Sequence, residues 1–212
     1  MVVDKKCKKC RRAGEKLFLK GERCFTPKCA FERKPYPPGK TGTKKRSKRS
    51  ATGYGLQLRE KQKVKNIYRV DERQFATYVK EAAASHDTKP AEKLYQNLEL
   101  RLDNVVFRMG FAFSRSIARQ MVTHGHVTVN GRRVTIPSYR LKEGDQLGIR
   151  PGSEDNGLFN EVASNITKQP SIPWLAVDVK KLQGSVSDYP KVDKEKSSEM
   201  FDLTSVIEFY SR

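Results

Sequence analysis

The sequence predicts an α+β protein: a mainly helical N-terminal domain with a zinc knot, joined to a helix-turn-helix domain with a small antiparallel sheet. Three observations predict it. Between residues 98 and 150 the apolar spacing changes from a helical to an alternating period. All four cysteines lie within the first thirty residues, as two close pairs. The 43 lysines and arginines far outnumber the 24 acidic residues.

The charge is unevenly distributed along the chain. Residues 1–60 hold 19 basic and 5 acidic residues, whereas residues 151–212 hold 7 and 10. This excess favours a polyanionic partner, nucleic acid before a membrane surface. No apolar run approaches the ~20 residues of a membrane span, and the first ten residues lack the apolar core of a secretory signal. We therefore expect a cytoplasmic nucleic-acid-binding protein whose last third is structural or faces proteins.

The cysteines are Cys7, Cys10, Cys24 and Cys29, spaced C-x2-C-x13-C-x4-C. Two close pairs separated by a loop can bring four thiolates to the corners of a tetrahedron, which predicts one structural Zn²⁺ ion closed to water. The alternatives are two disulfides, a redox CxxC motif, or four unrelated thiols. Basic residues beside the cysteines favour thiolate and are candidate RNA contacts: Lys8, Lys9, Arg11 and Arg12.

A proline- and glycine-rich stretch separates the cysteines from a basic run at residues 43–50. Taken alone, this run is typical of a disordered charged linker. Beside a zinc knot and a basic domain, we expect a strand that becomes ordered against phosphates. The candidate RNA-binding residues are Lys44, Lys45, Arg46, Lys48 and Arg49, continued by Tyr54 and Arg59.

Helices are predicted next. Asp71 followed by Gln74 resembles a capping box, and Pro90 suits a first helical turn. Ser114 is a good N-cap, and Gly125 suits the left-handed residue that ends the helix it begins. A single helix ending at Gly110 is predicted by one apolar stripe: Leu98, Leu102, Val105, Val106 and Met109.

An antiparallel hairpin follows. Val127 and Val129 alternate with polar residues, and Asn130-Gly131 supplies a type I′ turn. Val134 and Ile136 are expected to return on the same face. Leu147 and Ile149 then predict a third strand.

The polar face of residues 98–150 is rich in arginine, which forks onto phosphate and stacks on bases as lysine cannot. Amide and aromatic side chains among the arginines could contact bases or ribose hydroxyls. The alternative is a solvated surface that is arginine-rich by chance. The candidate RNA-binding residues are Arg101, Asn104, Arg115, Arg119, Gln120, His124, His126, Arg132, Arg133, Tyr139 and Arg140.

After residue 150 the pattern weakens. Phe159, Val162, Ala163 and Ile166 suggest a helix, and residues 174–179 suggest a strand. A polar, turn-rich stretch follows. The last apolar stripe predicts a helix at 201–212 that packs back against the N-terminal third. The predicted domains are therefore residues 1–97, completed by 201–212, and residues 98–200.

The stretch RLDNVVFRMGFAFSRSIARQMVTHGHVTVNGRRV, with IPSYRLKEGDQL after it, resembles the S-four RNA-binding domain. The flanks RRAGEKLFLKGERCFTPKCAFERKPYPPGK, YGLQLREKQKVK, IPWLAVD and SVIEFYSR resemble the bacterial-type small-subunit ribosomal protein four family, in order. Cysteine-bearing members of that family hold zinc at the four matching positions, and other members lack these cysteines. Residues between 182 and 201 depart from the family pattern.

The resemblance implies a structural protein of the ribosome. It implies a primary binder of small-subunit (16S-type) ribosomal RNA that nucleates assembly of the 5′ domain and contributes to decoding accuracy. Implied partners are neighbouring small-subunit proteins, notably protein five, and for some members their own mRNA. We expect no membrane and no homo-oligomer, and a cytoplasmic ribosome of bacterial type, or else an organellar one. The basic regions 1–60 and 98–150 are expected to contact different helices of one folded RNA junction.

Two other classes stay open on the sequence alone. One is a stand-alone RNA-binding factor or RNA-modifying enzyme accessory that uses the same domain, and the other is a zinc-dependent nucleic-acid regulator. The sequence contains no phosphate-binding glycine loop, HExxH or GxSxG motif. The residues after 150 are too few for a typical catalytic fold. We therefore predict that the protein is not an enzyme.

Overall fold

The computed structural model describes the chain in two compact units with a mixed helix and sheet content. Unit 1 comprises residues 1–91 and 193–212, and unit 2 comprises residues 92–192. The residues described are 5–39, 52–153, 157, 159, 162, 166, 172–192 and 201–211. No helix in these ranges is both long and apolar enough to cross a membrane.

Unit 1 begins with three short helices around the cysteines: α1 (Lys6–Ala13), the 3-10 helix η1 (Gly21–Cys24) and α2 (Ala30–Arg33). Gly14 ends α1 with φ 81°, and its N–H donates to the carbonyl of Cys10 at 3.0 Å. The Arg11 guanidinium donates to the carbonyls of Lys34 at 3.0 Å and Tyr36 at 2.9 Å. Side-chain hydrogen bonds therefore tie α1 to the segment that follows α2.

Two longer helices form the core of unit 1: α3 (Gly53–Tyr68) and α4 (Glu72–Ala83). Thr52 caps α3, and the N–H of Gln74 donates to the Asp71 carboxylate at 2.8 Å, which confirms Asp71 as the predicted N-cap. Tyr54 and Arg59 lie on α3, so the prediction that they continue an extended basic strand is wrong. The Thr52 cap and the buried Val64 and Ile67 farther along favour a helix.

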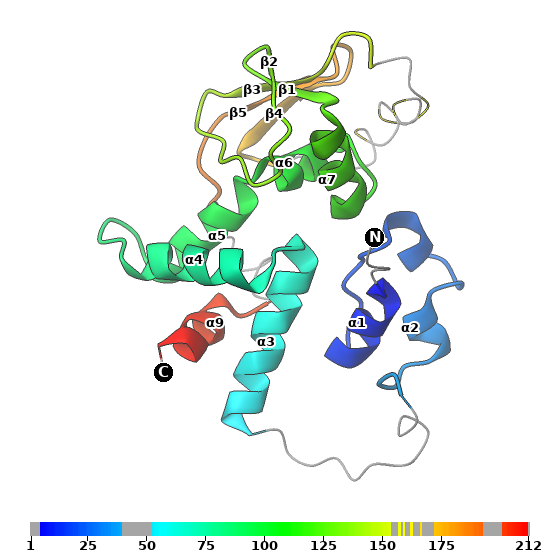
Figure 1. The fold of residues 1–212 in the computed structure, drawn as a ribbon, viewed down its shortest axis with the longest axis vertical. Coiled ribbons are helices and arrows are strands. Elements are labelled where there is room, and N and C mark those ends of the chain that lie inside the picture. Colours follow the sequence, from blue (N-terminus) through cyan, green and yellow to red (C-terminus); the bar gives the residue numbers. More distant parts are fainter. Residues whose placement is uncertain are drawn as a thin grey trace. The chain divides into compact units, whose positions relative to one another are not determined.

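The last helix, α9 (Leu203–Tyr210), packs against α3 and α4. Figure 1 shows it beside α3, although most of the chain separates the two in sequence. The Phe209 ring lies 5.4 Å from that of Tyr54, and the Tyr210 ring lies 6.1 Å from that of Phe75. Val206 is fully buried. The C-terminal helix therefore supplies apolar surface to the N-terminal unit.

Three helices precede the sheet of unit 2: α5 (Pro90–Glu99), α6 (Leu102–Arg108) and α7 (Arg115–His124). The prediction of one helix through Leu98 and Met109 is wrong, because the chain breaks between α5 and α6. Arg101 is extended there and bridges to Arg140, and the N–H of Leu141 donates to the carbonyl of Leu100 at 2.9 Å. The predicted N-cap at Ser114 and left-handed Gly125 are both confirmed.

The described part of unit 2 contains a five-stranded antiparallel sheet in the order β2-β1-β3-β5-β4. The strands are β1 (Val127–Val129), β2 (Arg132–Arg133), β3 (Gln146–Ile149), β4 (Leu175–Asp178) and β5 (Gln183–Val186). Asn130 and Gly131 have φ of 49° and 75°, as the predicted type I′ turn requires. Val134 packs against the core, but Ile136 is 58% exposed and lies beyond the end of β2.

Apolar side chains from α6, α7 and the sheet form the core of unit 2. Phe159 and Val162 are buried in it, whereas Ala163 of the suggested helix lies outside the described residues. β5 falls in the stretch interpreted as turns, because its sequence, QGSV, carries little apolar pattern. Its neighbours β3 and β4 pair with it along both edges, which stabilises a strand of weak propensity.

Candidate nucleic-acid interface

A buried carboxylate orients two arginines on the helices of unit 2. Glu99 is fully buried, and the Arg108 guanidinium donates to it twice, at 2.6 and 2.9 Å. The Asn104 amide also donates to the Glu99 carboxylate, at 2.9 Å, and its oxygen accepts from Arg115 Nε at 2.8 Å. The Arg115 guanidinium lies 4.5 Å above the ring of Phe107. Arg108 and Arg115 are thereby held in fixed positions at the edge of the core.

A second carboxylate, Asp103, accepts two hydrogen bonds from Arg101, at 3.0 and 2.8 Å. Arg101 and Asn104 are each only 2% exposed. The prediction that these two side chains contact RNA does not fit this burial, and we correct it. The Arg119 guanidinium lies 3.9 Å from the Asp103 carboxylate and keeps 39% of its side chain exposed. The buried Asn104 and Asp103 therefore orient the more exposed Arg115 and Arg119.

The exposed face over α7 and the hairpin carries most of the other predicted residues. Arg133 donates to the carbonyl of His124 at 3.3 Å and crosses directly over Gly125, where a Cβ would lie 2.0 Å from Arg133 Nε. Arg115 and Arg119 are half-buried. The exposed side chains at predicted positions are those of Gln120, His124, Arg132, Arg133, Tyr139 and Arg140.

His126 differs from these because it is half-buried. Its Nδ1 lies 3.2 Å from Ser153 Oγ, and its ring lies 5.8 Å from that of Phe159. Burial first, and then the neighbouring His124 and Arg150, lower the pKa of His126. The imidazole is therefore neutral at pH 7 and can offer a hydrogen bond but not a charge.

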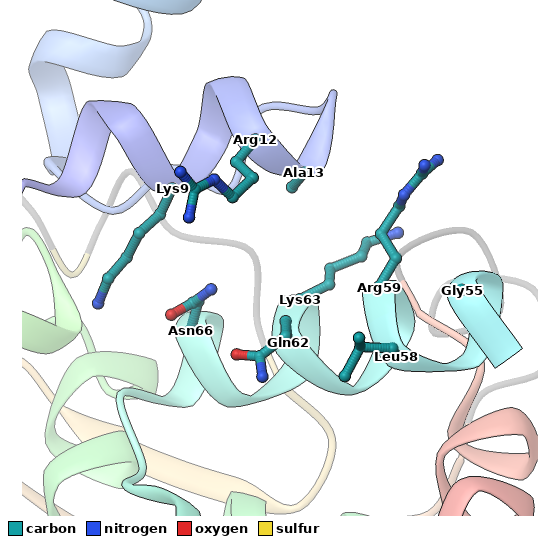
Figure 2. Close-up of a pocket in the computed structure, with 9 residues that line it drawn as sticks. All are labelled: Lys9, Arg12, Ala13, Gly55, Leu58, Arg59, Gln62, Lys63 and Asn66. Carbon is teal, nitrogen blue, oxygen red and sulfur yellow. The ribbon is translucent and has the colours of Figure 1, made fainter. Parts of the chain in front are cut away.

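Unit 1 contains a cleft of about 560 Å³ between α1 and α3. Figure 2 shows residues of α1 facing a row of α3 residues, with Lys9 and Asn66 at one end and Arg59 and Gly55 at the other. Arg12 and Arg59 are exposed, and Lys9 is half-buried. The lining residues are Lys9, Arg12, Ala13, Gly55, Leu58, Arg59, Gln62, Lys63 and Asn66.

Other predicted residues of unit 1 lie in different settings. Lys8 is exposed on α1, whereas Arg11 makes the hydrogen bonds that tie α1 to residues 34 and 36. Tyr54 is 52% exposed, and its ring is tilted by 35° against that of Phe209. Five predicted residues lie outside the described part of the chain: Lys44, Lys45, Arg46, Lys48 and Arg49.

The four cysteines are all free thiols within unit 1. Cys7 and Cys10 lie one turn apart on α1, Cys24 ends η1 and Cys29 precedes α2. Burial, followed by the other three thiols, raises the pKa of Cys10, and a backbone hydrogen bond at Leu17 opposes this. No group of three or more potential ligands with the geometry of a metal site occurs among the residues that the structure describes.

Sequence reasoning missed an exposed aromatic pair in this region. The rings of Phe18 and Phe25 stack with centroids 4.9 Å apart and planes 24° apart, although Phe25 is 74% exposed. Phe18 also has φ 50°, a left-handed conformation that costs free energy in an aromatic residue. The sequence pattern that could have indicated this pair is FLKGERCFTPK, in which aromatic residues are interleaved with lysine and arginine. Gln62 and Asn66 were also missed, because only the packing of α1 beside α3 brings them to a cleft.

Comparisons with known proteins cover nearly the whole chain. Residues 2–99 match the family model described as the ribosomal protein S4/S9 N-terminal domain, and residues 100–147 match the S4 domain. The chain is 50% identical over 207 residues to small ribosomal subunit protein uS4 of Thermotoga petrophila, covering 97% of this chain and 96% of the relative. It is 46% identical to uS4 of Thermus thermophilus, with the same coverage, and 45% identical to uS4 of Koribacter versatilis, covering 99% and 98%.

Proposed function

The chain belongs to the uS4 family of small ribosomal subunit proteins, of bacterial type, and from this premise we propose how its two basic surfaces act. Its function is that of a structural RNA-binding protein of the ribosome, in the cytoplasm, and not of an enzyme. The partner of both surfaces is small-subunit ribosomal RNA. The alternatives of a stand-alone RNA-binding factor and of an enzyme accessory are not favoured.

One observation carries the proposal: each unit presents its own cationic surface, and the two surfaces differ in chemistry. In unit 1 the cations line a cleft between helices. In unit 2 Arg115 and Arg119 are aimed by the buried Asn104 and Asp103. Cations fixed in position recognise the spacing of phosphates, whereas mobile ones provide only attraction.

We infer from this that recognition depends on RNA shape. The deep major groove of A-form RNA excludes side chains, so neither surface reads the base sequence of a duplex. The proposed target is a folded junction in the 5′ domain of small-subunit RNA, whose assembly the protein would nucleate. In the assembled subunit it would adjoin protein five and contribute to decoding accuracy, and it would act as a single copy. Binding to its own mRNA would use the same surfaces.

The test is affinity as a function of salt for the folded 5′ domain and for a plain duplex of equal length. Replacing Arg115 and Arg119 by Ala should cost about 1–3 kcal/mol together and flatten the salt dependence. The matched control replaces Lys180 and Lys181, which are exposed cations elsewhere in unit 2, by Ala. Equal affinity of the wild-type protein for both RNAs at physiological salt would refute the proposal.

We also propose that unit 1 holds one structural Zn²⁺ ion through Cys7, Cys10, Cys24 and Cys29. The donor set is chemically suited, because all four thiols are free and three of them are buried. Four thiolates would leave no open position for water, so the ion would cross-link α1, η1 and α2 and do no chemistry. Little apolar surface holds these short helices together, so the metal would contribute to their folding.

Metal analysis of the purified protein should give about one zinc per chain. Cys24→Ser should lower that content and reduce amide protection in residues 6–33, while Ser153→Ala, in unit 2, should change neither. Two disulfides in protein kept under reducing conditions, or full amide protection without metal, would refute the zinc proposal.

A further inference from the structure

We propose that the cleft between α1 and α3 binds one unpaired nucleotide of the RNA. Its phosphate would lie on the Arg12 guanidinium, and Lys9 and Arg59, at opposite ends of the cleft, would attract the phosphates on either side of it. Its ribose and base would lie against Leu58, Gln62 and Asn66. This proposal rests on the proposed RNA-binding function and specifies what one of its two surfaces holds.

The charge of the cleft selects an anion. No acidic side chain is found among the described residues that line it. Lys63 contributes little net charge, because its ammonium lies 2.7 Å from Glu15 and 3.8 Å from Glu60. Arg12 and Arg59 are exposed and make no hydrogen bond or ion pair with a described residue. Two guanidiniums are therefore available to fork onto phosphate oxygens.

The rest of the lining is unsuited to a bare phosphate. Ala13 and Leu58 supply apolar surface, and Gln62 and Asn66 supply amides one helical turn apart on the same face of α3. Both amides are half-buried, and neither bonds to a described residue. Amide groups suit the Watson–Crick edge of a base or a ribose 2′-hydroxyl, and apolar surface suits the face of a base. Together these groups match a nucleotide.

The size of the cleft selects a single nucleotide. Its volume of about 560 Å³ falls within the range of pockets that enclose small ligands. A duplex cannot enter, because its bases are stacked and its edges lie inside the grooves. An unpaired nucleotide in a loop or junction can turn out of the stack, which is the state that proteins recognise on RNA.

The first experiment fills the cleft without changing its charge. Leu58→Trp should weaken binding of the folded 5′ domain at least tenfold, with the same dependence on salt as the wild-type protein. Leu56→Trp is the matched control, because Leu56 lies on the same helix, is 50% exposed and does not line the cleft. Should Leu58→Trp disturb folding, the double variant Gln62→Ala and Asn66→Ala replaces it, with the same expected result.

The second experiment observes the amides directly in the full chain. Adenosine 5′-monophosphate should shift the side-chain NH₂ resonances of Gln62 and Asn66 in NMR spectra more than inorganic phosphate does at equal ionic strength. Equal shifts would reduce the cleft to a general anion site and overturn the proposal.

The two proposals fail in different ways. Equal affinity of the wild-type protein for the 5′ domain and for a duplex would overturn the proposed RNA-binding role. A wild-type preference that survives unchanged in Leu58→Trp, or in the double variant, would overturn the nucleotide site alone.

Discussion

Replacing Glu72 by Gln should loosen the attachment of the C-terminal helix. The Glu72 carboxylate accepts hydrogen bonds from Lys61 at 2.6 Å, Lys65 at 2.9 Å and Tyr210 at 2.7 Å. Burial alone would raise the pKa of Glu72, but these three donors lower it from 4.5 to about 2. Converted in full, that difference is about 3.4 kcal/mol. The side chain is 48% exposed, so solvent screening reduces the contribution to about 1 kcal/mol.

The sign of the pH dependence follows from the lowered pKa. A carboxylate whose pKa is about 2 when folded and 4.5 when unfolded stabilises the fold above pH 4.5. This contribution declines as the pH falls and is lost near pH 2. The difference in unfolding free energy between the wild-type protein and Glu72→Gln should therefore be largest at neutral pH and shrink below pH 4.5.

Urea unfolding followed by amide exchange in α3, α4 and α9 measures this difference. Glu92→Gln is the matched control, because Glu92 also lies in the first turn of a helix, whereas Lys61 and Tyr210 donate their hydrogen bonds to Glu72. This control removes a negative charge from a helix N-terminus but leaves the three hydrogen bonds to Glu72 intact. A difference between Glu72→Gln and wild type that stays the same at pH 7 and pH 3 would refute the reasoning.

Three further predictions concern the two units. Glu99→Gln should lower the unfolding free energy of unit 2 by about 2–3 kcal/mol, measured by Trp174 fluorescence in urea. This loss is smaller than for a fully buried ion pair, because Arg108 is 29% exposed. No change would show that Arg108 is held by other contacts. Gly125→Ala should cost more than Gly144→Ala, since both have positive φ but only Gly125 lies under Arg133, and equal costs in the same assay would contradict this. Deleting residues 201–212 should reduce amide protection in α3 and α4 and leave unit 2 folded, and unchanged protection would rule out their dependence on α9.

Local signals in the sequence predicted the features that local physics decides. Ser114 and Asp71 cap helices, and Asn130-Gly131 makes the tight turn, because each needs only its own neighbours along the chain. The apolar stripe through Leu98 and Leu102 correctly predicted that both residues are buried. It wrongly predicted one continuous helix, because the backbone between them bonds to residues near 140. Such a pairing between distant segments leaves no trace in the helical period.

The candidate side chains divide in the same way. Arg115 and Arg119 were predicted because their positions fall on the polar side of a helix, and both are partly exposed in the structure. Arg101 and Asn104 looked equivalent, but the buried carboxylates of Asp103 and Glu99 accept their hydrogen bonds. The cleft residues Gln62 and Asn66 could not be found from spacing alone, because their significance depends on α1, which lies far from α3 in sequence.

The contribution of α9 to the first unit has a consequence for synthesis. Unit 2 ends at residue 192, whereas unit 1 needs the apolar side chains of residues 203–210. A chain emerging N-terminus first can therefore complete its second unit while the first still lacks a part of its core. Domains usually finish folding in the order in which they are made; here the residues of the second unit are all translated first, and the first unit can be completed only when the last helix has been translated.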